Sequence, residues 1–150
     1  MTMKQLFTLM IAAMLMAPAS VVAMSDLSPA ELVEARKMNF RQSGGAMRQM
    51  RGQLQNGDFQ AIVAAGEAMA AWAENMPSYF PEGTGPDTQK TNAKPSIWQE
   101  FDKFTSLAQD NQRAALALVT AAKSGEASDV MAKMQALGKT CAASHSNFKN

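Results

Sequence analysis

The feature that most constrains the fold is an alternating three- and four-residue step between mostly apolar side chains over residues 97–148. Two segments carry it, and "KSGEASD" separates them. The first runs through Ile97, Phe101, Phe104, Ala108, Asn111, Ala115, Leu118 and Ala122. The second runs through Val130, Met134, Leu137, Cys141, His145 and Phe148. Because this spacing keeps residues on one face of an α-helix, it predicts helices over about 96–123 and 128–149, the second capped by Ser128.

Helix start and stop signals divide the preceding part of the chain. Ser28, followed by Pro29 and Glu31, is typical of an N-cap with a capping box, and predicts a helix over about 28–55. Apolar residues recur there every seven positions, at Val33, Phe40, Met47 and Leu54. The tripeptide "NGD" then ends this helix and caps a second one over about 59–76.

A long connection separates the second and third predicted helices. Residues 77–96, "PSYFPEGTGPDTQKTNAKPS", are rich in proline and glycine, which predicts irregular structure. Loops of this length in compact domains are often functional. Two short connections and one long one favour an all-α, antiparallel four-helix bundle over residues 24–150.

The first 23 residues resemble a signal peptide. Lys4 precedes the apolar run "LFTLMIAAMLMA", which is short for a membrane-spanning helix. Val21 and Ala23 fit the small-residue cleavage pattern, so we expect cleavage after Ala23, with Ala19 as a second choice. A retained N-terminal anchor is the alternative. The pattern predicts export to the periplasm, with no membrane span after cleavage.

Charge and cysteine content exclude several function classes. The chain has 14 basic and 13 acidic residues, and cleavage would remove the basic Lys4. The resulting balance argues against nucleic acid or an anionic membrane as a partner. A single cysteine gives an exported chain no internal disulfide, so its thiol must pair with another chain, react or carry a cofactor. The sequence has no recognisable catalytic triad or acid–base pair, so we do not expect an enzyme.

The only cysteine and the only histidine, Cys141 and His145, stand one helical turn apart and should point into the bundle. A zinc site lacks ligands here, and a Cys–His nucleophile lacks an exposed thiol and a third orienting group. Two other interpretations of Cys141 and His145 are favoured over the zinc site and the nucleophile. One is a buried thiol beside a satisfied core histidine. The other is haem, with a thioether to Cys141 and the His145 imidazole on the iron.

Arg36 and two glycines are unusual in the first predicted helix. Arg36 lies near its apolar stripe, which indicates either an anionic partner such as a haem propionate, or a stem that covers the core. Phe40 is a core aromatic in every interpretation. Gly44 and Gly45 each cost the helix about 1 kcal/mol. That cost predicts close approach by another helix, by a second subunit or by the macrocycle.

Four segments, taken in order, resemble the cytochrome c-prime family. They are "ELVEARKMNFRQSGGAMRQM", "PSYFPEGT", "NAKPSIWQEFDKF" and "LGKTCAASHSNFK". The resemblance covers essentially the whole mature sequence. It implies an exported four-helix-bundle protein, typically a homodimer packed through its first two helices. Its pentacoordinate, high-spin haem would bind nitric oxide or carbon monoxide, or exchange single electrons with a redox partner protein.

The resemblance also implies roles for individual residues. His145 would be the axial ligand of the haem iron, and Cys141 would carry a thioether. Ser144 departs from the family's C-x-x-C-H motif, in which a second cysteine makes the other thioether. A serine hydroxyl does not add to a vinyl group in its place. Haem would therefore be held by one thioether or non-covalently, and the alternative is a haem-free bundle acting as a structural or interaction module.

Four further positions match the surroundings of the family's haem. Phe40 falls at the distal position, where an apolar side chain keeps the sixth iron site empty. Arg36 would contact a propionate. Lys149 follows the haem histidine, where its charge could tune the iron's potential. Thr91 and its neighbours would line the haem edge.

Overall fold

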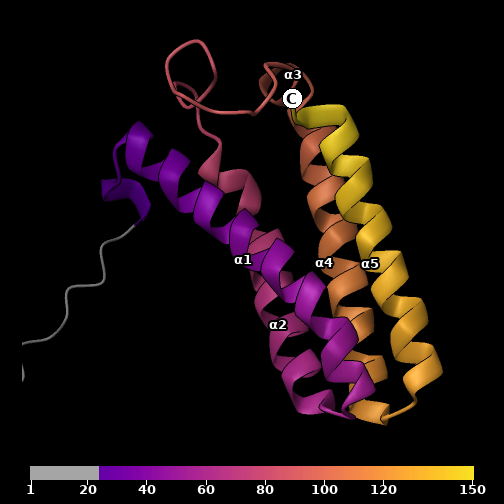
Figure 1. Cartoon of the computed structure of the whole chain (residues 1–150). Helices are drawn as coiled ribbons and strands as arrows, with labels where there is room; N and C mark the ends of the chain where they lie inside the picture. The colour runs from indigo at the N-terminus through magenta and orange to yellow at the C-terminus, as the bar shows by residue number, and fades with distance from the viewer. Residues whose placement is uncertain (1–23) are drawn as a thin grey trace, which may run out of the picture.

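The computed structural model describes residues 24–150, which form a bundle of four long helices (Figure 1). These are α1 (Pro29–Gln55), α2 (Phe59–Asn75), α4 (Phe101–Ser124) and α5 (Ala127–Phe148). Short helices are η1 (Met24–Asp26), η2 (Met76–Tyr79) and α3 (Ser96–Gln99). The described residues contain no named strand, only an isolated bridge between Ala93 and Lys149. The predicted all-α bundle is confirmed.

The expected signal peptide, residues 1–23, and its cleavage site lie outside the described residues. Within residues 24–150, no helix is long and apolar enough to cross a membrane.

Most helix ends form where the sequence signals stand. At the start of α1, the Glu31 backbone N–H donates to Ser28 Oγ at 3.4 Å, and the Ser28 N–H donates to Glu31 Oε2 at 2.8 Å. Asp58 caps α2 by accepting from the Ala61 N–H at 3.1 Å. Gly125 ends α4 in the left-handed region, at φ +76°, which glycine adopts without steric cost.

Two details of the third and fourth predicted helices are wrong. The expected helix over 96–123 is divided at Glu100, which has φ −123° and ψ 44°, into α3 and α4. Bonds to the end of α5 hold α3 in place, because Ser96 Oγ donates to the Asn147 carbonyl at 3.3 Å. Such tertiary contacts override helix propensity. The N-cap of α5 is Glu126 rather than Ser128, because Gly125 reverses the chain in one residue and α5 begins directly afterwards.

The long helices pack unequally, and this positions the site. Helices α2 and α4 make the most extensive contact. They approach closely at Gly66, where a Cβ would lie 2.7 Å from Val119 Cγ2. By contrast, α1 contacts α5 sparsely and diverges from it toward the end that carries the C-terminus (Figure 1). The divergence leaves space between these two helices.

The connection between α2 and α3 is tied to the C-terminal end of α5. The Lys94 N–H donates to the Phe148 carbonyl at 2.9 Å, and the Asn150 N–H donates to the Asn92 carbonyl at 2.9 Å. Aromatic contacts support the same end, with ring centroids of Phe104 and Phe148 at 5.5 Å. The long loop therefore has a fixed position beside the end of α5.

Candidate functional site

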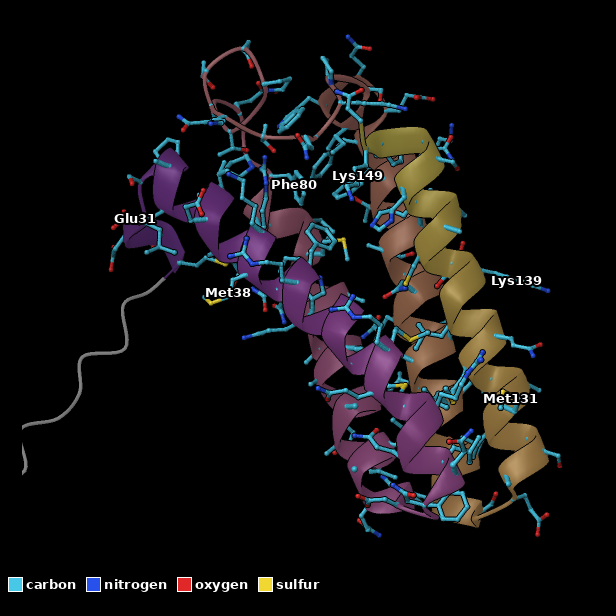
Figure 2. The ribbon with its side chains drawn as sticks, viewed as in Figure 1. Glu31, Met38, Phe80, Met131, Lys139 and Lys149 are labelled. Atoms are coloured by element: carbon cyan, nitrogen blue, oxygen red, sulfur yellow. The ribbon has the colours of Figure 1, made fainter. Side chains whose placement is uncertain are left out.

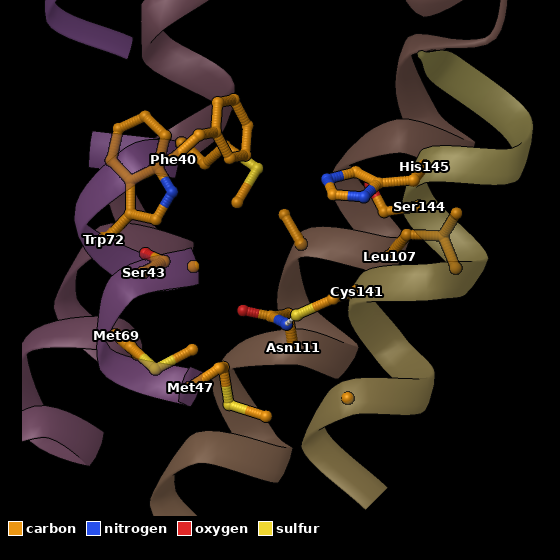
Figure 3. Close-up of a pocket in the computed structure, with 14 residues that line it drawn as sticks. Phe40, Ser43, Met47, Met69, Trp72, Leu107, Asn111, Cys141, Ser144 and His145 are labelled. Carbon is orange, nitrogen blue, oxygen red and sulfur yellow. Dashed lines mark hydrogen bonds between the residues drawn. The ribbon is translucent and has the colours of Figure 1, made fainter. Parts of the chain in front are cut away.

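Two adjoining cavities lie between α1 and α5. The smaller, about 250 Å³, is lined mainly by apolar side chains from all four long helices (Figure 3). The larger, about 480 Å³, lies beside the loop that is tied to the end of α5. Both are lined by Phe40, Gly44, Ser144 and His145. The two cavities thus form one continuous site on the scale of small-molecule pockets.

Phe40 of α1 and His145 of α5 face each other where the cavities meet. Their ring centroids are 6.5 Å apart, with an angle of 66° between the planes. In Figure 3 the His145 imidazole points from α5 across the cavity toward Phe40. Trp72 packs edge-on against Phe40, with centroids 5.2 Å apart, and holds it in place. A flat aromatic layer between the Phe40 and His145 rings would need one carbon–carbon contact of about 3.5–4.0 Å on each of its two faces. The distance between the two ring centroids is close to the sum of two such contacts.

His145 faces the cavity, as expected, but it is exposed rather than packed into the core. Its imidazole makes no hydrogen bond to any residue of the 24–150 range, so it is not a satisfied core histidine. Partial burial, and secondarily the charge of Lys149, lower the pKa of His145 below its usual value. The ring is therefore neutral at pH 7, which is the form that coordinates a metal ion.

Cys141 and Ser144 share the cavity-lining face of α5 with His145. Cys141 is half-buried and lines the smaller cavity, where its Sγ accepts a hydrogen bond from Asn111 Nδ2 at 3.3 Å. Ser144 is also half-buried and lines both cavities. The residue at the position of the missing second cysteine therefore faces the same space.

Arg36 is one of the most deeply buried side chains, at 2% exposure. Its Nη1 donates to the Tyr79 carbonyl at 3.1 Å and to Thr84 Oγ1 at 3.0 Å. Its Nη2 donates to the Thr84 carbonyl at 2.7 Å and to Thr91 Oγ1 at 3.1 Å. Of the two alternatives for Arg36, the one in which only the stem is buried does not hold, because the loop supplies backbone and hydroxyl acceptors for the guanidinium.

The charge of Arg36 has no carboxylate partner among residues 24–150. All four of its acceptors are neutral, and the Phe80 ring lies 4.1 Å from its Cζ. Burial lowers the pKa of Arg36 to about 10. Because a buried charge is costly unless it is paired, this arrangement favours an anion at the cavity that Arg36 lines.

The larger cavity has a cationic rim, which we define as Arg36, Lys37, Arg41 and Lys149. None of its lining residues is Asp or Glu. Lys149 follows α5 directly and stands at the same end of the bundle as Phe80 (Figure 2). Thr91 lines this cavity as well, and its hydroxyl joins the loop to Arg36. The geometry thus brings together all six residues singled out from the sequence.

The two glycines of α1 do not mark a contact with another helix of this chain. A Cβ at Gly44 would have Arg48 Nη1, at 3.4 Å, as its nearest neighbour, and one at Gly45 would have Arg48 Nη2 at 3.8 Å. The close helix approach occurs at Gly66 instead. Gly44 lines both cavities, so its missing side chain widens the site.

Residues 31–149 match the family model for cytochrome c'. This chain belongs to the cytochrome c' family. The matched region contains all four long helices apart from Pro29 and Ala30 of α1, and it includes every residue of the site described above.

Known cytochromes c' agree with this assignment. The cytochrome c' of Rhodospirillum rubrum is 45% identical over 83 residues, which are 55% of this chain and 56% of that protein. The crystal structure of cytochrome c' from Thermochromatium tepidum superposes with a TM-score of 0.74 at 32% identity, over 83% of this chain and 98% of that one. Another solved cytochrome c', with an unusual ligand-controlled dimer dissociation, gives a TM-score of 0.74 at 26% identity, covering 82% and 97%.

The residues of the site fit the c-type haem of this family. Haem is a flat, largely apolar macrocycle with two carboxylates at one edge and two vinyl groups elsewhere. The site offers a narrow gap between two rings, a cationic rim at one end and an apolar wall with one thiol at the other. With Cys141 as the only cysteine of the chain, the donor set suits attachment through a single sulfur.

Sequence reasoning missed the role of Asn111 beside Cys141. It counted Asn111 only as one position of the apolar helix face. An amide at a position where the spacing predicts an apolar side chain was a signal that could have been read. Trp72 was likewise given no role by the sequence analysis. Trp72 lines the smaller cavity, and its buried Nε1 has no hydrogen-bond partner among the described residues.

Proposed function

We propose that this cytochrome c' is an exported, periplasmic haem protein that binds nitric oxide or carbon monoxide and transfers single electrons. The observation that carries the proposal is the placement of His145 opposite Phe40 across a cavity that also holds Cys141. Haem, when bound there, would supply a single pentacoordinate, high-spin iron for both activities.

Each side chain of the site would then have a separate role toward the haem. The neutral His145 imidazole would be the only protein ligand to the metal. Phe40, which has no atom able to coordinate, would cover the opposite face and exclude water and anions. Arg36 and Thr91 would lie at the propionates, and the charge of Lys149 would tune the potential. Small neutral gases would therefore be favoured over charged or bulky ligands.

Electron transfer requires a partner surface near the haem edge. In the cationic rim, Arg41 and Lys149 are exposed, so the rim would attract a redox protein with an acidic surface. Homodimer formation would use a different face of α1. Met38 is exposed and lies seven residues before Gly45, outside the cavity linings (Figure 2). That face would seat a second copy, in keeping with the dimer of the ligand-controlled relative.

Carbon monoxide difference spectra of the reduced protein test the gas-binding proposal. Wild type should give a shifted Soret band on addition of the gas, and His145→Ala should bind much less haem and lose this response. Ser146→Ala is the matched control, because Ser146 is the exposed neighbour and lines neither cavity. A haem-loaded wild type whose spectrum does not change with carbon monoxide, or a His145→Ala variant indistinguishable from wild type, would contradict the assignment.

A further inference from the structure

Asn111 is a buried polar residue in the apolar wall of the smaller cavity. It lies within α4 and is 8% exposed. Its Nδ2 donates to Thr140 Oγ1 at 2.8 Å and to Cys141 Sγ at 3.3 Å, both on α5. The two hydrogens of one amide group thus join α4 to the cysteine and to the residue before it.

The hydrogen-bond network fixes which way this amide points. The Thr140 hydroxyl donates its only hydrogen to the Leu137 carbonyl, at 2.7 Å, so toward Asn111 it can only accept. The amide nitrogen of Asn111 must therefore face α5. Its oxygen is left on the cavity side, as Figure 3 shows, and has no partner among residues 24–150.

Packing alone does not account for an amide at this position. Burying an amide in an apolar wall costs free energy unless its hydrogen bonds are made. Leucine would fill a similar volume without that cost. What the amide adds is a donor that selects one side-chain rotamer of Cys141, the rotamer that holds Sγ at the cavity wall.

We propose that Asn111 is the positioning residue for covalent haem attachment through Cys141. This inference rests on the proposed function, because it requires haem in the cavity. The Cys141 S–H would add across the double bond of one vinyl group. Sulfur would bond to the vinyl carbon next to the ring, the thiol hydrogen would go to the terminal carbon, and the addition consumes no oxidant or reductant.

The departure at Ser144 explains why such a residue matters in this chain. A C-x-x-C-H motif has two sulfurs, so a misdirected one still leaves a covalent bond. Here Cys141 is the only cysteine on the cavity-lining face of α5, so the orientation of its side chain decides whether any thioether forms. That orientation is set by Asn111 of the neighbouring helix α4, and not by a residue of the motif itself.

The experiment compares Asn111→Leu with wild type, both as full chains produced with a periplasmic haem-attachment system. Intact mass spectrometry under denaturing conditions gives the covalent fraction, and absorbance before unfolding gives total haem. The covalent fraction should fall about threefold to tenfold, the effect of losing one hydrogen bond, while extractable haem and free Cys141 thiol rise. Asn39→Leu is the matched control, because the Asn39 amide donates only within α1, to the Ala35 carbonyl at 3.0 Å.

Thr140→Val separates positioning from a purely structural role. It removes the other partner of the amide and leaves the bond to sulfur, so attachment should stay near wild type. If Thr140→Val reduces attachment as much as Asn111→Leu, the amide only joins the helices and the inference is overturned. Asn111→Ala makes the same comparison if circular dichroism shows that Asn111→Leu does not fold.

The remaining outcomes distinguish this inference from the proposed function. An unchanged covalent fraction in Asn111→Leu overturns the positioning role alone. A wild type whose haem is all extractable overturns thioether attachment through Cys141 and leaves gas binding intact. A wild type without any haem overturns both.

Discussion

The Arg36 guanidinium of α1 donates two hydrogen bonds to Thr84 in the long loop, one to the hydroxyl at 3.0 Å and one to the carbonyl at 2.7 Å. Thr84 is itself fully buried. A charged group therefore organises the loop beside the haem site from inside the molecule. The same side chain fixes the loop and presents a positive charge to the larger cavity.

Arg36→Met should destabilise the protein even without haem. The substitution removes all four hydrogen bonds and leaves buried acceptors unpaired, so we expect the free energy of unfolding to fall by about 2–4 kcal/mol. Urea denaturation followed by circular dichroism measures this. Arg48→Met, an exposed change on the same helix, should cost about 0.5 kcal/mol or less. Equal losses in the two variants would contradict the structural role of Arg36.

Arg36 should also discriminate between charged and neutral haem edges. The wild-type polypeptide should bind haem more tightly than haem dimethyl ester, in which both propionates are neutral, because the ester gives the buried cation no anionic partner. Arg48→Met should keep this preference, and Arg36→Met should lose most of it. Titration followed at the Soret band gives the two affinities. A preference that persists in Arg36→Met would assign the propionates to other rim residues.

Phe40→Ala should open the face of the site opposite His145. Without the ring, water gains access to the sixth coordination position, so the spectrum should shift from five- to six-coordinate, and bulkier ligands should bind. The half-buried ring should cost about 1–3 kcal/mol of stability. Phe59→Ala is the control, since Phe59 is equally half-buried but lines neither cavity. Unchanged ligand selectivity in haem-loaded Phe40→Ala would exclude Phe40 as the distal residue.

Haem affinity should depend on pH through His145. Burial and Lys149 lower the pKa of His145, so the imidazole is neutral at pH 7 and becomes protonated only below its ordinary value of about 6.5. Because the pKa of His145 is lower in the folded chain than in the unfolded chain, the haem-free fold should also lose stability as the pH falls below about 6.5. We expect constant affinity from pH 8 to 7, then a fall approaching tenfold per unit once the pH is below the folded-state pKa. A His145→Ala variant with the same pH profile would assign the effect elsewhere.

Gly66 and Gly52 give opposite predictions for one substitution. Gly66→Ala would place a methyl group 2.7 Å from Val119 Cγ2, so the Val119 side chain or the two helices must shift, at a cost of about 1–3 kcal/mol. Gly52→Ala meets nothing within 4 Å on an exposed face of α1, and should stabilise by about 0.4–1 kcal/mol. Thermal unfolding of the two variants measures both. If both variants are destabilised, the loss in Gly66→Ala can no longer be assigned to the close contact between α2 and α4.

The sequence predicted most of the helices, because their signals are local. The six residues singled out for the site line the two cavities, and their roles stay predictions. Helical periodicity and caps such as Ser28 and Asp58 depend on neighbouring residues. The break at Glu100 could not be found this way, since the bond that Ser96 of α3 donates to the Asn147 carbonyl joins segments 51 residues apart. Likewise, the four acceptors of Arg36 lie 43 to 55 residues away, and no local pattern indicates them.

The same limit applies to the glycines, for which the sequence left three explanations open: another helix, a second subunit or the macrocycle. Gly44 and Gly45 were conspicuous as a pair in the sequence, but the close helix contact falls at Gly66, in an alanine-rich stretch where one more small residue does not stand out. Asn111 was visible as a polar residue at an apolar step, but its partners were not, because they become its neighbours only through the turn at Gly125.

The most direct test of the central claim is one sample of wild-type protein, made with a periplasmic haem-attachment system and analysed by absorption and by intact mass. A Soret band of the five-coordinate type, which shifts with carbon monoxide, together with a haem mass that survives unfolding, is the result we predict. A colourless protein with the bare polypeptide mass and a titratable Cys141 thiol would contradict it.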